Sequence, residues 1–145
     1  MLVEVKVKVA RIIDGKTRKR IESLLMDCEL FSQAEYTAMS NYAAEQSQGL
    51  IESSEIQSLR ISPIKEVATQ FTGDYTFVAT LKDIWLDTDG TEKTLKYKVL
   101  LWADDLTQAN SNISQLTKQG YDMQIEGIKQ VDYEYLSTLS DGTDN

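Results

Sequence analysis

The side chains that most often carry out catalysis are scarce in this sequence. The chain has 145 residues, no histidine and one cysteine, Cys28. Without histidine there is no Ser-His-Asp or Cys-His nucleophile, and there is no imidazole to act as a general base near neutral pH. Cys28 lies between Asp27 and Glu29, and neighbouring carboxylates raise the pKa of a thiol and make it less reactive. We therefore expect no catalytic residue and no enzymatic activity.

Carboxylate pairs are the other residues that could do chemistry. Asp87-Thr88-Asp89-Gly90 resembles the start of a calcium-binding loop, but threonine occupies the next ligand position, 91, and the chain then enters a predicted strand. Because Asp-x-Asp-Gly is also common in turns, we interpret this segment as a hairpin turn. Asp104-Asp105 precedes a predicted helix, whose N-terminus is stabilised by negative charge. The sequence predicts no metal site and no cofactor.

Positive charge is concentrated near the start of the chain. Residues 1–20 hold seven basic and two acidic residues, whereas the whole chain holds 15 basic and 23 acidic residues and has a formal net charge of −8. A segregated positive surface attracts phosphates even on an acidic protein, although the affinity is weak and sensitive to salt. These basic residues are the first candidates for a binding site.

Strand periodicity predicts which way the basic side chains point. Residues 3–9 alternate valine with charged residues, which places Lys6 and Lys8 on the face opposite the valines. Residues 95–103 alternate in the same way and place Lys96 and Lys98 on one face. The basic tip of the first hairpin is expected to extend this positive surface. The candidate nucleic-acid-binding residues are Lys6, Lys8, Arg18, Lys19, Arg20, Lys96 and Lys98.

The two halves of the sequence share short matches in the same order. Phe31-Ser32-Gln33-Ala34 corresponds to Leu106-Thr107-Gln108-Ala109 at an offset of 75 positions. Glu55-Ile56-Gln57 corresponds to Asp122-Met123-Gln124 at an offset of 67, so the second copy is expected to be eight residues shorter between its helix and its last strand. Matches in one order indicate a tandem duplication.

Each copy is predicted to fold as strand, strand, helix, strand. Asp14-Gly15 and its counterpart Asp89-Gly90 supply the turn between the first two strands. The first helix is expected to start at Ser32, whose hydroxyl would form a capping box with Glu35. The second helix would be capped by Thr107, and Gly49 and Gly120 would end the two helices or the turns after them. Single closing strands are expected at Ile56–Val67 and Met123–Tyr135.

Two such copies give an α+β fold with six strands in a mostly antiparallel sheet and two helices packed on one face. Residues 1–72 form the first repeat and residues 73–136 the second; we expect them to share one core. Residues 137–145 form an acidic tail that is expected to be frayed. No apolar run is long enough to span a membrane and the N-terminus has no signal-peptide pattern, which favours a cytoplasmic protein without a membrane partner.

Three segments carry a resemblance to a known family. Val5-Lys6-Val7, residues 26–35 and residues 100–109 resemble a family of short proteins from gut bacteria and their phages that is catalogued as a domain of unknown function. The resemblance covers most of residues 1–131 and rests on features that form the fold. The closing segment, Gly127–Leu136, departs from the ending of that family. The resemblance implies a fold and a phage context, and it carries over no functional residue.

Two functions fit these patterns. The first is a non-enzymatic module that binds single-stranded DNA or RNA through the lysine-lined sheet face, with Trp85 and Trp102 near Tyr97 to stack on bases. The other interpretation, which the acidic net charge favours, is that the lysines form an ordinary solvated face that discourages aggregation. The alternative function is a protein–protein interaction or self-assembly module, including a homo-oligomer, that uses sheet edges or the acidic surface of the helices and tail.

Overall fold

The protein is an α+β fold of two units. The structure is a computed structural model that describes residues 1–117 and 123–137. Within those residues it has two helices and eight strands in two mostly antiparallel sheets, which confirms the predicted fold class. The helix end predicted at Gly120 and the tail from residue 138 onward lie outside the described residues.

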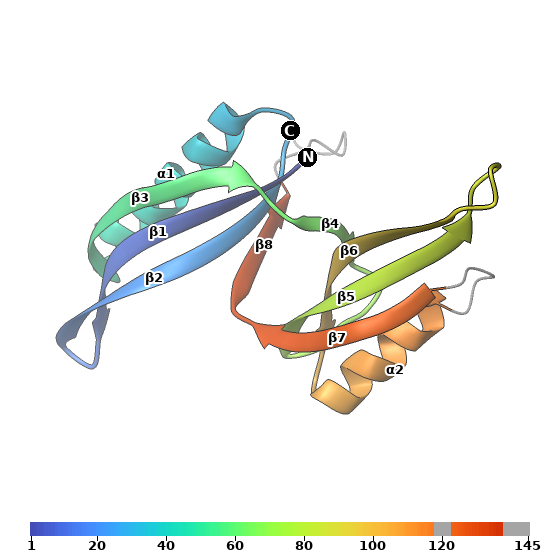
Figure 1. Ribbon diagram of the computed structural model, residues 1–145. Coiled ribbons are helices and arrows are strands. Elements are labelled where there is room, and N and C mark those ends of the chain that lie inside the picture. Colours follow the sequence, from blue (N-terminus) through green and yellow to red (C-terminus); the bar gives the residue numbers. More distant parts are fainter. Residues whose placement is uncertain (118–122, 138–145) are drawn as a thin grey trace. The chain divides into compact units, whose positions relative to one another are not determined.

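The first compact unit, unit 1, comprises Met1–Ser62 and the segment that begins at Tyr133. Its elements are β1 (Leu2–Ile13), β2 (Lys16–Asp27), α1 (Phe31–Ser47), β3 (Ile51–Ile61) and β8 (Tyr133–Ser137). The strand order in its sheet is β3-β1-β2-β8, in which β8 alone among the described strands of this sheet runs parallel to its neighbour (Figure 1).

The second unit, unit 2, comprises Pro63–Asp132. Its elements are β4 (Ile64–Ala68), β5 (Tyr75–Leu86), β6 (Glu92–Ala103), α2 (Leu106–Thr117) and β7 (Met123–Val131). The strand order is β4-β6-β5-β7, and β4 runs parallel to β6. The two sheets therefore have the same topology, with β4 in the place that β8 takes in unit 1.

The strand that follows each closing strand belongs to the other unit. The predicted single closing strands, 56–67 and 123–135, are wrong because each consists of two strands. The amide of Ser62 still donates to the Leu2 carbonyl, with an N–O distance of 2.9 Å, but Pro63 has no N–H and cannot continue that ladder. The chain then enters unit 2 as β4 and returns through Asp132 to unit 1 as β8. The repeat boundary predicted at residues 72 and 73 thus differs from the division between the units.

A β-bulge occurs at corresponding places in the two sheets. The pairing of β1 with β3 shifts between Lys6 and Val7, and the pairing of β5 with β7 shifts between Thr80 and Leu81. An extra residue on an edge strand increases its twist and interrupts its ladder. The shared topology and the shared bulge agree with a tandem duplication, which stays a prediction.

The pairing register corrects one of the sequence matches. Val7 pairs with Ile56 in unit 1, and Leu81 pairs with Ile125 at the corresponding place in unit 2. Ile56 therefore corresponds to Ile125, whereas the sequence match had set it against Met123. The match fails because short polar strands carry little information about register.

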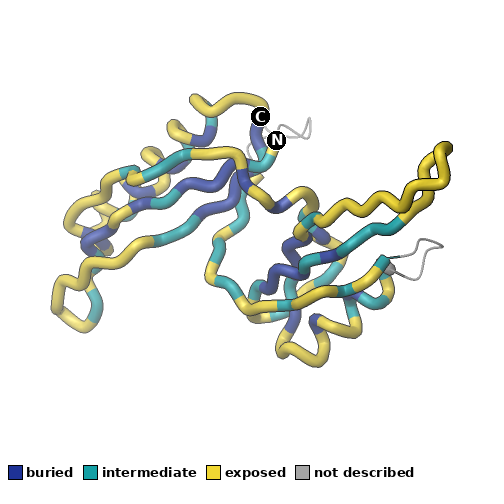
Figure 2. The backbone as a smooth tube through the Cα atoms, viewed as in Figure 1, coloured by how far each residue is buried: buried dark blue, intermediate teal, exposed yellow. Residues whose placement is uncertain are grey.

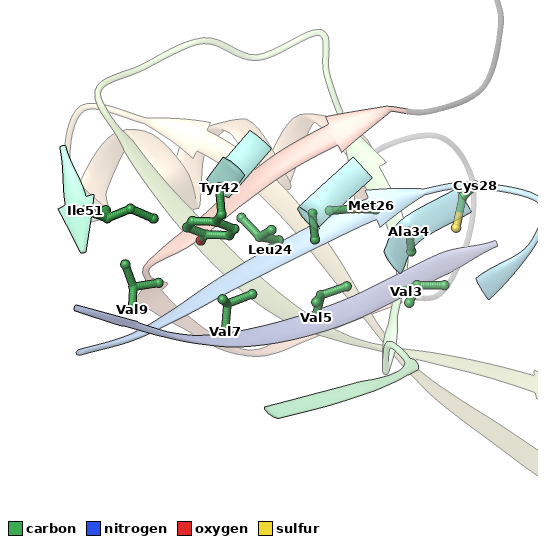
Figure 3. Packing of buried hydrophobic residues seen from close by; sticks show 11 residues of the cluster. Val3, Val5, Val7, Val9, Leu24, Met26, Cys28, Ala34, Tyr42 and Ile51 are labelled. Carbon is green, nitrogen blue, oxygen red and sulfur yellow. The ribbon is translucent and has the colours of Figure 1, made fainter. Parts of the chain in front are cut away.

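The core of unit 1 confirms the predicted alternation of β1. Its four valines are at most 1% exposed and pack with α1 and β2 (Figure 3). The cluster comprises Val3, Val5, Val7, Val9, Leu24, Met26, Cys28, Ala34, Ala38, Tyr42 and Ile51. Full burial of a valine contributes about 1.5–3 kcal/mol relative to exposure, so this stripe fixes which face of β1 meets the helix.

Unit 2 has its own cluster beneath α2. Phe77, Ala79 and Leu81 of β5 pack there with residues of β6 and with Ala109 and Ile113 of the helix. Figure 2 shows that burial is concentrated in the parts of the hairpin strands that lie away from the turns, whereas the tips of the β1–β2 and β5–β6 hairpins are exposed. The prediction that the repeats share one core stays a prediction.

Each helix begins one residue before its predicted cap. Because α1 starts at Phe31 and α2 at Leu106, Ser32 and Thr107 lie inside the helices and the predicted Ser32 capping box is wrong. Gln33 caps instead: its Oε1 accepts hydrogen bonds from the amides of Glu29 and Leu30 at 2.8 and 3.0 Å. The predicted stop at Gly49 is confirmed, since this glycine follows α1 with a φ of +77°.

Candidate nucleic-acid interface

Lys6 and Lys8 lie on the face of the unit 1 sheet opposite α1. We call this side of each sheet, opposite the helix of its own unit, the helix-free face. The two lysines alternate with Val5, Val7 and Val9, which pack toward α1, so their orientation follows the predicted strand periodicity. Lys8 is exposed and Lys6 is half-buried.

The three basic candidates on β2 do not share one face. Lys19 pairs with Ala10 and therefore lies on the helix-free face beside Lys8. Arg18 and Arg20, one residue to either side, project on the helix side, and the Arg20 Nε lies 3.4 Å from a Glu22 carboxylate oxygen. The hairpin thus extends the lysine surface through Lys19.

In unit 2, Lys96 and Lys98 also lie on the helix-free face, because the alternating residues of β6 pack under α2. Sequence reasoning missed two further lysines on this face. Lys82 pairs directly with Lys96 across the β5–β6 ladder, and Lys129 pairs with Val78. The Lys96 ammonium nitrogen lies 3.2 Å from a carboxylate oxygen of Glu126, so one of these lysines is ion-paired.

The predicted aromatic group is not brought together. Trp102 lies on the helix-free face of β6, two alternations beyond Lys98. Tyr97 lies on the helix side, where its hydroxyl contacts the sulfur of Met123 at 3.1 Å. Trp85 also lies on the helix side, at the exposed end of the hairpin. Of the three aromatic residues proposed from the sequence, only Trp102 lies on the lysine face. It is therefore the only one of the three that could stack on a base of a nucleic acid bound there.

Glu4 adds a buried negative charge to the helix-free face of unit 1. It is 1% exposed, and its carboxylate accepts hydrogen bonds from Arg60 Nε at 3.0 Å and from the Tyr133 hydroxyl at 2.7 Å. Burial alone would raise the pKa of Glu4, but these two hydrogen bonds and the charge of Arg60 outweigh burial and lower it. Glu4 is thus ionised and neutralised locally.

Arg11 lies on the helix side of the sheet, where ion pairs neutralise its charge, so it does not contribute to the lysine surface. Its guanidinium forms a two-point contact with Glu22, with both N–O distances 2.8 Å, and also donates to Glu45 at 2.9 Å. The Tyr42 hydroxyl donates to Glu22 at 3.0 Å. Burial alone would raise the pKa of Glu22, but the hydrogen bonds from Arg11 and Tyr42 lower it. Arg11 therefore joins β1, β2 and α1.

The carboxylate pairs have local partners. Asp89 accepts a hydrogen bond from the amide of Thr91 at 2.9 Å, and the Asp87 amide donates to the Thr91 carbonyl at 2.9 Å, so this segment is the predicted hairpin turn. Asp105 accepts a hydrogen bond from the amide of Gln108 at 2.7 Å and caps α2. In the part of the chain that the structure describes, no three acidic, cysteine or histidine side chains are grouped to hold a metal ion.

Cys28 lies in the core of unit 1. It is 0% exposed and packs in the cluster beneath α1. Burial raises the pKa of its thiol, and the charge of Asp27 adds to this effect. A thiol in this environment is a poor nucleophile.

The faces of Lys82 and Lys129 could not be predicted from the periodicity of the sequence. Residues 75–86 alternate poorly, so the face of Lys82 becomes clear only from its pairing with Lys96. Lys129 follows the bulge in β7. The extra residue in the bulge shifts the alternation by one, so residues after it point to the opposite face from the one expected by counting from residues before it. By contrast, the different faces of Arg18 and Lys19 could be read from strict alternation along one strand.

Comparison with known families gave one finding. A family model described as "Domain of unknown function (DUF4494)" matches residues 1–135. The searches of curated proteins and of solved structures each found no match. Neither helix of the described residues is long and apolar enough to cross a membrane.

Proposed function

The chain belongs to the DUF4494 family of domains of unknown function, and we propose that it binds single-stranded nucleic acid without catalysing a reaction. Binding would use the helix-free faces of the two sheets. On the resemblance to proteins of gut bacteria and phages, we propose the bacterial cytoplasm as its setting.

The observation that carries this proposal is the repeated placement of lysines. In both units the face opposite the helix carries them, whereas acidic side chains on those faces are few and partly neutralised. The lysines of these faces are Lys6, Lys8 and Lys19 in unit 1 and Lys82, Lys96, Lys98 and Lys129 in unit 2. Alternate residues on a strand lie roughly 6.6–6.8 Å apart, so such rows can contact successive phosphates of a flexible strand.

A single strand suits these faces better than a duplex does. Sequence-specific proteins insert a helix or a two-stranded ribbon into the duplex major groove, whereas α1 carries only two charged side chains, both glutamates, and α2 carries none. A sheet with lysines and a tryptophan at its surface offers phosphate contacts and a stacking partner, which single strands need. The net charge of −8 predicts weak binding that salt suppresses strongly.

The test is fluorescence anisotropy with a labelled single strand of about 16 nucleotides, titrated at about 50 mM and about 200 mM salt. The diagnostic variant replaces one lysine per unit on the helix-free faces, Lys8→Gln with Lys98→Gln. The control variant, Lys16→Gln with Lys93→Gln, changes net charge equally but removes one helix-side lysine per unit.

We expect the diagnostic variant to weaken binding and to reduce the slope of log affinity against log salt by about 1.4, since each phosphate contact with a single strand contributes about 0.7. The control variant should bind within about twofold of the natural protein. Equal losses in the two variants would mean that net charge alone drives the association, and no binding at either salt concentration would refute the proposed function.

A second candidate, a protein–protein interaction module, is favoured by the solvent side of α1. Tyr36 is 74% exposed and Met39 57% exposed, and they lie three residues apart on one side of the helix. The bulges in β3 and β7 make those edges poor sites for strand addition. If α1 is the interface, sedimentation should detect an oligomer that the variant Tyr36→Ser with Met39→Ser converts to a monomer; a monomeric natural protein would exclude self-assembly.

A further inference from the structure

A pocket opens on the helix-free face of unit 1 near the basic hairpin. Its volume is about 270 Å³, and it is lined by Lys8, Ala10, Lys19, Ser53, Ser54 and Glu55. These residues come from three adjacent strands, β1, β2 and β3, so a single sheet supplies the whole lining.

Local backbone structure explains the pocket. Ala10 provides a small side chain between two lysines, and the pairing of β1 with β3 shifts between Ala10 and Arg11. This second bulge displaces β3 beside the pocket. The bulged segment includes Glu52, one of whose carboxylate oxygens accepts a hydrogen bond from the Thr17 hydroxyl at 2.7 Å.

Two positive charges converge on this pocket. Lys19 pairs with Ala10, and Lys8 is the diagonal neighbour of Lys19 on the next strand, a spacing of roughly 7–8 Å. Both lysines are exposed, and neither forms an ion pair within the described residues. Ser53 pairs with Ala10 and brings its hydroxyl to the same face. Two ammonium groups and the Ser53 hydroxyl therefore lie on the same face at this site.

We propose that this pocket binds a phosphate group, which on the function proposed above belongs to the backbone or the end of the nucleic-acid strand. The volume lies just below the range of about 300–1,000 Å³ for drug-sized ligands, so the pocket suits a small hydrated anion rather than a whole nucleotide. A phosphate held by both lysines and Ser53 gains charge-assisted hydrogen bonds on two sides.

Glu55 sets the affinity of the pocket. It pairs directly with Lys8 and lines the same cavity, so its carboxylate repels a bound anion. Replacing it by glutamine removes the repulsion without changing the size of the side chain. A role in ligand binding thus predicts a gain from Glu55→Gln, which a purely structural role would not produce.

The first experiment titrates the full chain with inorganic phosphate at constant ionic strength, with chloride as the replaced anion, and follows backbone amide shifts. Lys8→Gln and Lys19→Gln should each weaken phosphate binding about tenfold. Lys16→Gln is the matched control, because Lys16 lies on the same strand as Lys19 but on the helix side, and it does not line the pocket. Ala10→Leu fills the pocket at constant charge and should also weaken binding.

Glu55→Gln should strengthen phosphate binding by about two- to fivefold. A thermal melt of each variant reports folding separately. The inference is overturned if Lys16→Gln weakens phosphate binding as much as Lys8→Gln does, if Ala10→Leu in a folded protein has no effect, or if phosphate shifts no amide near the pocket.

Oligonucleotides with and without a 5′-phosphate distinguish the source of the group. If the protein binds the 5′-phosphorylated oligonucleotide more tightly, the pocket holds a terminal phosphate. If it binds both oligonucleotides with equal affinity and Ala10→Leu weakens the binding of both, the pocket holds a backbone phosphate. If the protein binds phosphate but no oligonucleotide, the inference about the pocket is supported and the proposed function is refuted. If the protein binds oligonucleotides and Ala10→Leu does not change their affinity, the proposed function is supported and the inference about the pocket is refuted.

Discussion

Glu4 shows how unit 1 holds a charge inside a sheet. The carboxylate lies on the central strand β1, and its two partners come from the edge strands, Arg60 from β3 and Tyr133 from β8. A buried carboxylate that loses a partner costs several kcal/mol, so the arrangement is stable only while both edges are in place. One residue thus links the strand that leaves unit 1 to the strand that returns.

Tyr133→Phe should lower the free energy of unfolding by about 1–3 kcal/mol, because one oxygen of a buried carboxylate loses its hydrogen bond. Urea denaturation measures the loss. Tyr36→Phe removes a hydroxyl from an exposed tyrosine and should change the stability by less than about 0.5 kcal/mol. Equal effects of the two variants would contradict this role of Glu4.

The lowered pKa values of Glu4 and Glu22 predict acid sensitivity. Because their folded-state pKa values lie below the unfolded value of about 4.3, their contribution is fully present above that pH and is lost as pH falls through the folded-state values. The melting temperature should therefore fall steeply below about pH 4. Glu4→Gln should lower the melting temperature at neutral pH and flatten this acid limb; an unchanged limb would exclude Glu4 as a source.

Gly73→Ala should be destabilising by about 1–3 kcal/mol or more. A Cβ at residue 73 would collide with the backbone of Ala103, which cannot move aside as a flexible side chain could. Gly127→Ala is the control, since a Cβ there meets nothing within 4 Å and the backbone is not left-handed. Similar stability of the two variants in urea denaturation would contradict the close approach at Gly73.

At the scale of elements, the two helices begin with the same glutamine contact but different caps. Gln33 and Gln108 each accept a hydrogen bond from the amide four residues before them. In α2, Asp105 satisfies a further amide, whereas Leu30 at the corresponding place in α1 has no side-chain acceptor. The start of α1 therefore depends more strongly on its glutamine.

Gln33→Ala should destabilise the protein by about 1 kcal/mol and Gln108→Ala by less. Hydrogen exchange at the first turn of each helix measures the two effects locally. If Gln108→Ala frays α2 as much as Gln33→Ala frays α1, then Asp105 does not compensate for the lost contact.

Elements set by local pattern were predictable from the sequence. The valine alternation gave β1 and its buried face, and Asp14-Gly15 gave a two-residue turn in which both residues have positive φ. The faces of Lys6, Lys8, Lys96 and Lys98 followed from the same alternation. The helix caps were misplaced because serine and threonine are common caps, and the glutamine contact is visible only once the chain has turned.

At the scale of the whole molecule, the partner of each short parallel strand was not predictable. The sequence of residues 56–67 predicts one strand. No local pattern indicates that β4 pairs with β6 whereas β3 pairs with β1. Pairing between strands far apart in sequence depends on tertiary contacts. Each unit is consequently completed by a strand that follows the last antiparallel strand of the other unit.

Ending the chain at Asp132 should destabilise unit 1 and leave unit 2 largely unchanged. The truncation removes β8, which covers an edge of β2, contributes Leu136 to the core and holds Glu4. Both tryptophans lie in unit 2, so tryptophan fluorescence reports its unfolding, while hydrogen exchange of β1 and β2 reports unit 1. Equal losses in both units would mean that the chain unfolds as one body.

The return of β8 to unit 1 reverses the usual order of events during translation. Domains generally fold as they emerge from the ribosome, the N-terminal one first. Here unit 2 has all its strands once residue 132 has been synthesised, whereas the sheet that contains the first residues must wait for Tyr133–Ser137. A nascent chain would thus carry an unfilled parallel edge on β2 until Tyr133–Ser137 has been synthesised, and a chaperone or a neighbouring nascent copy could occupy that edge.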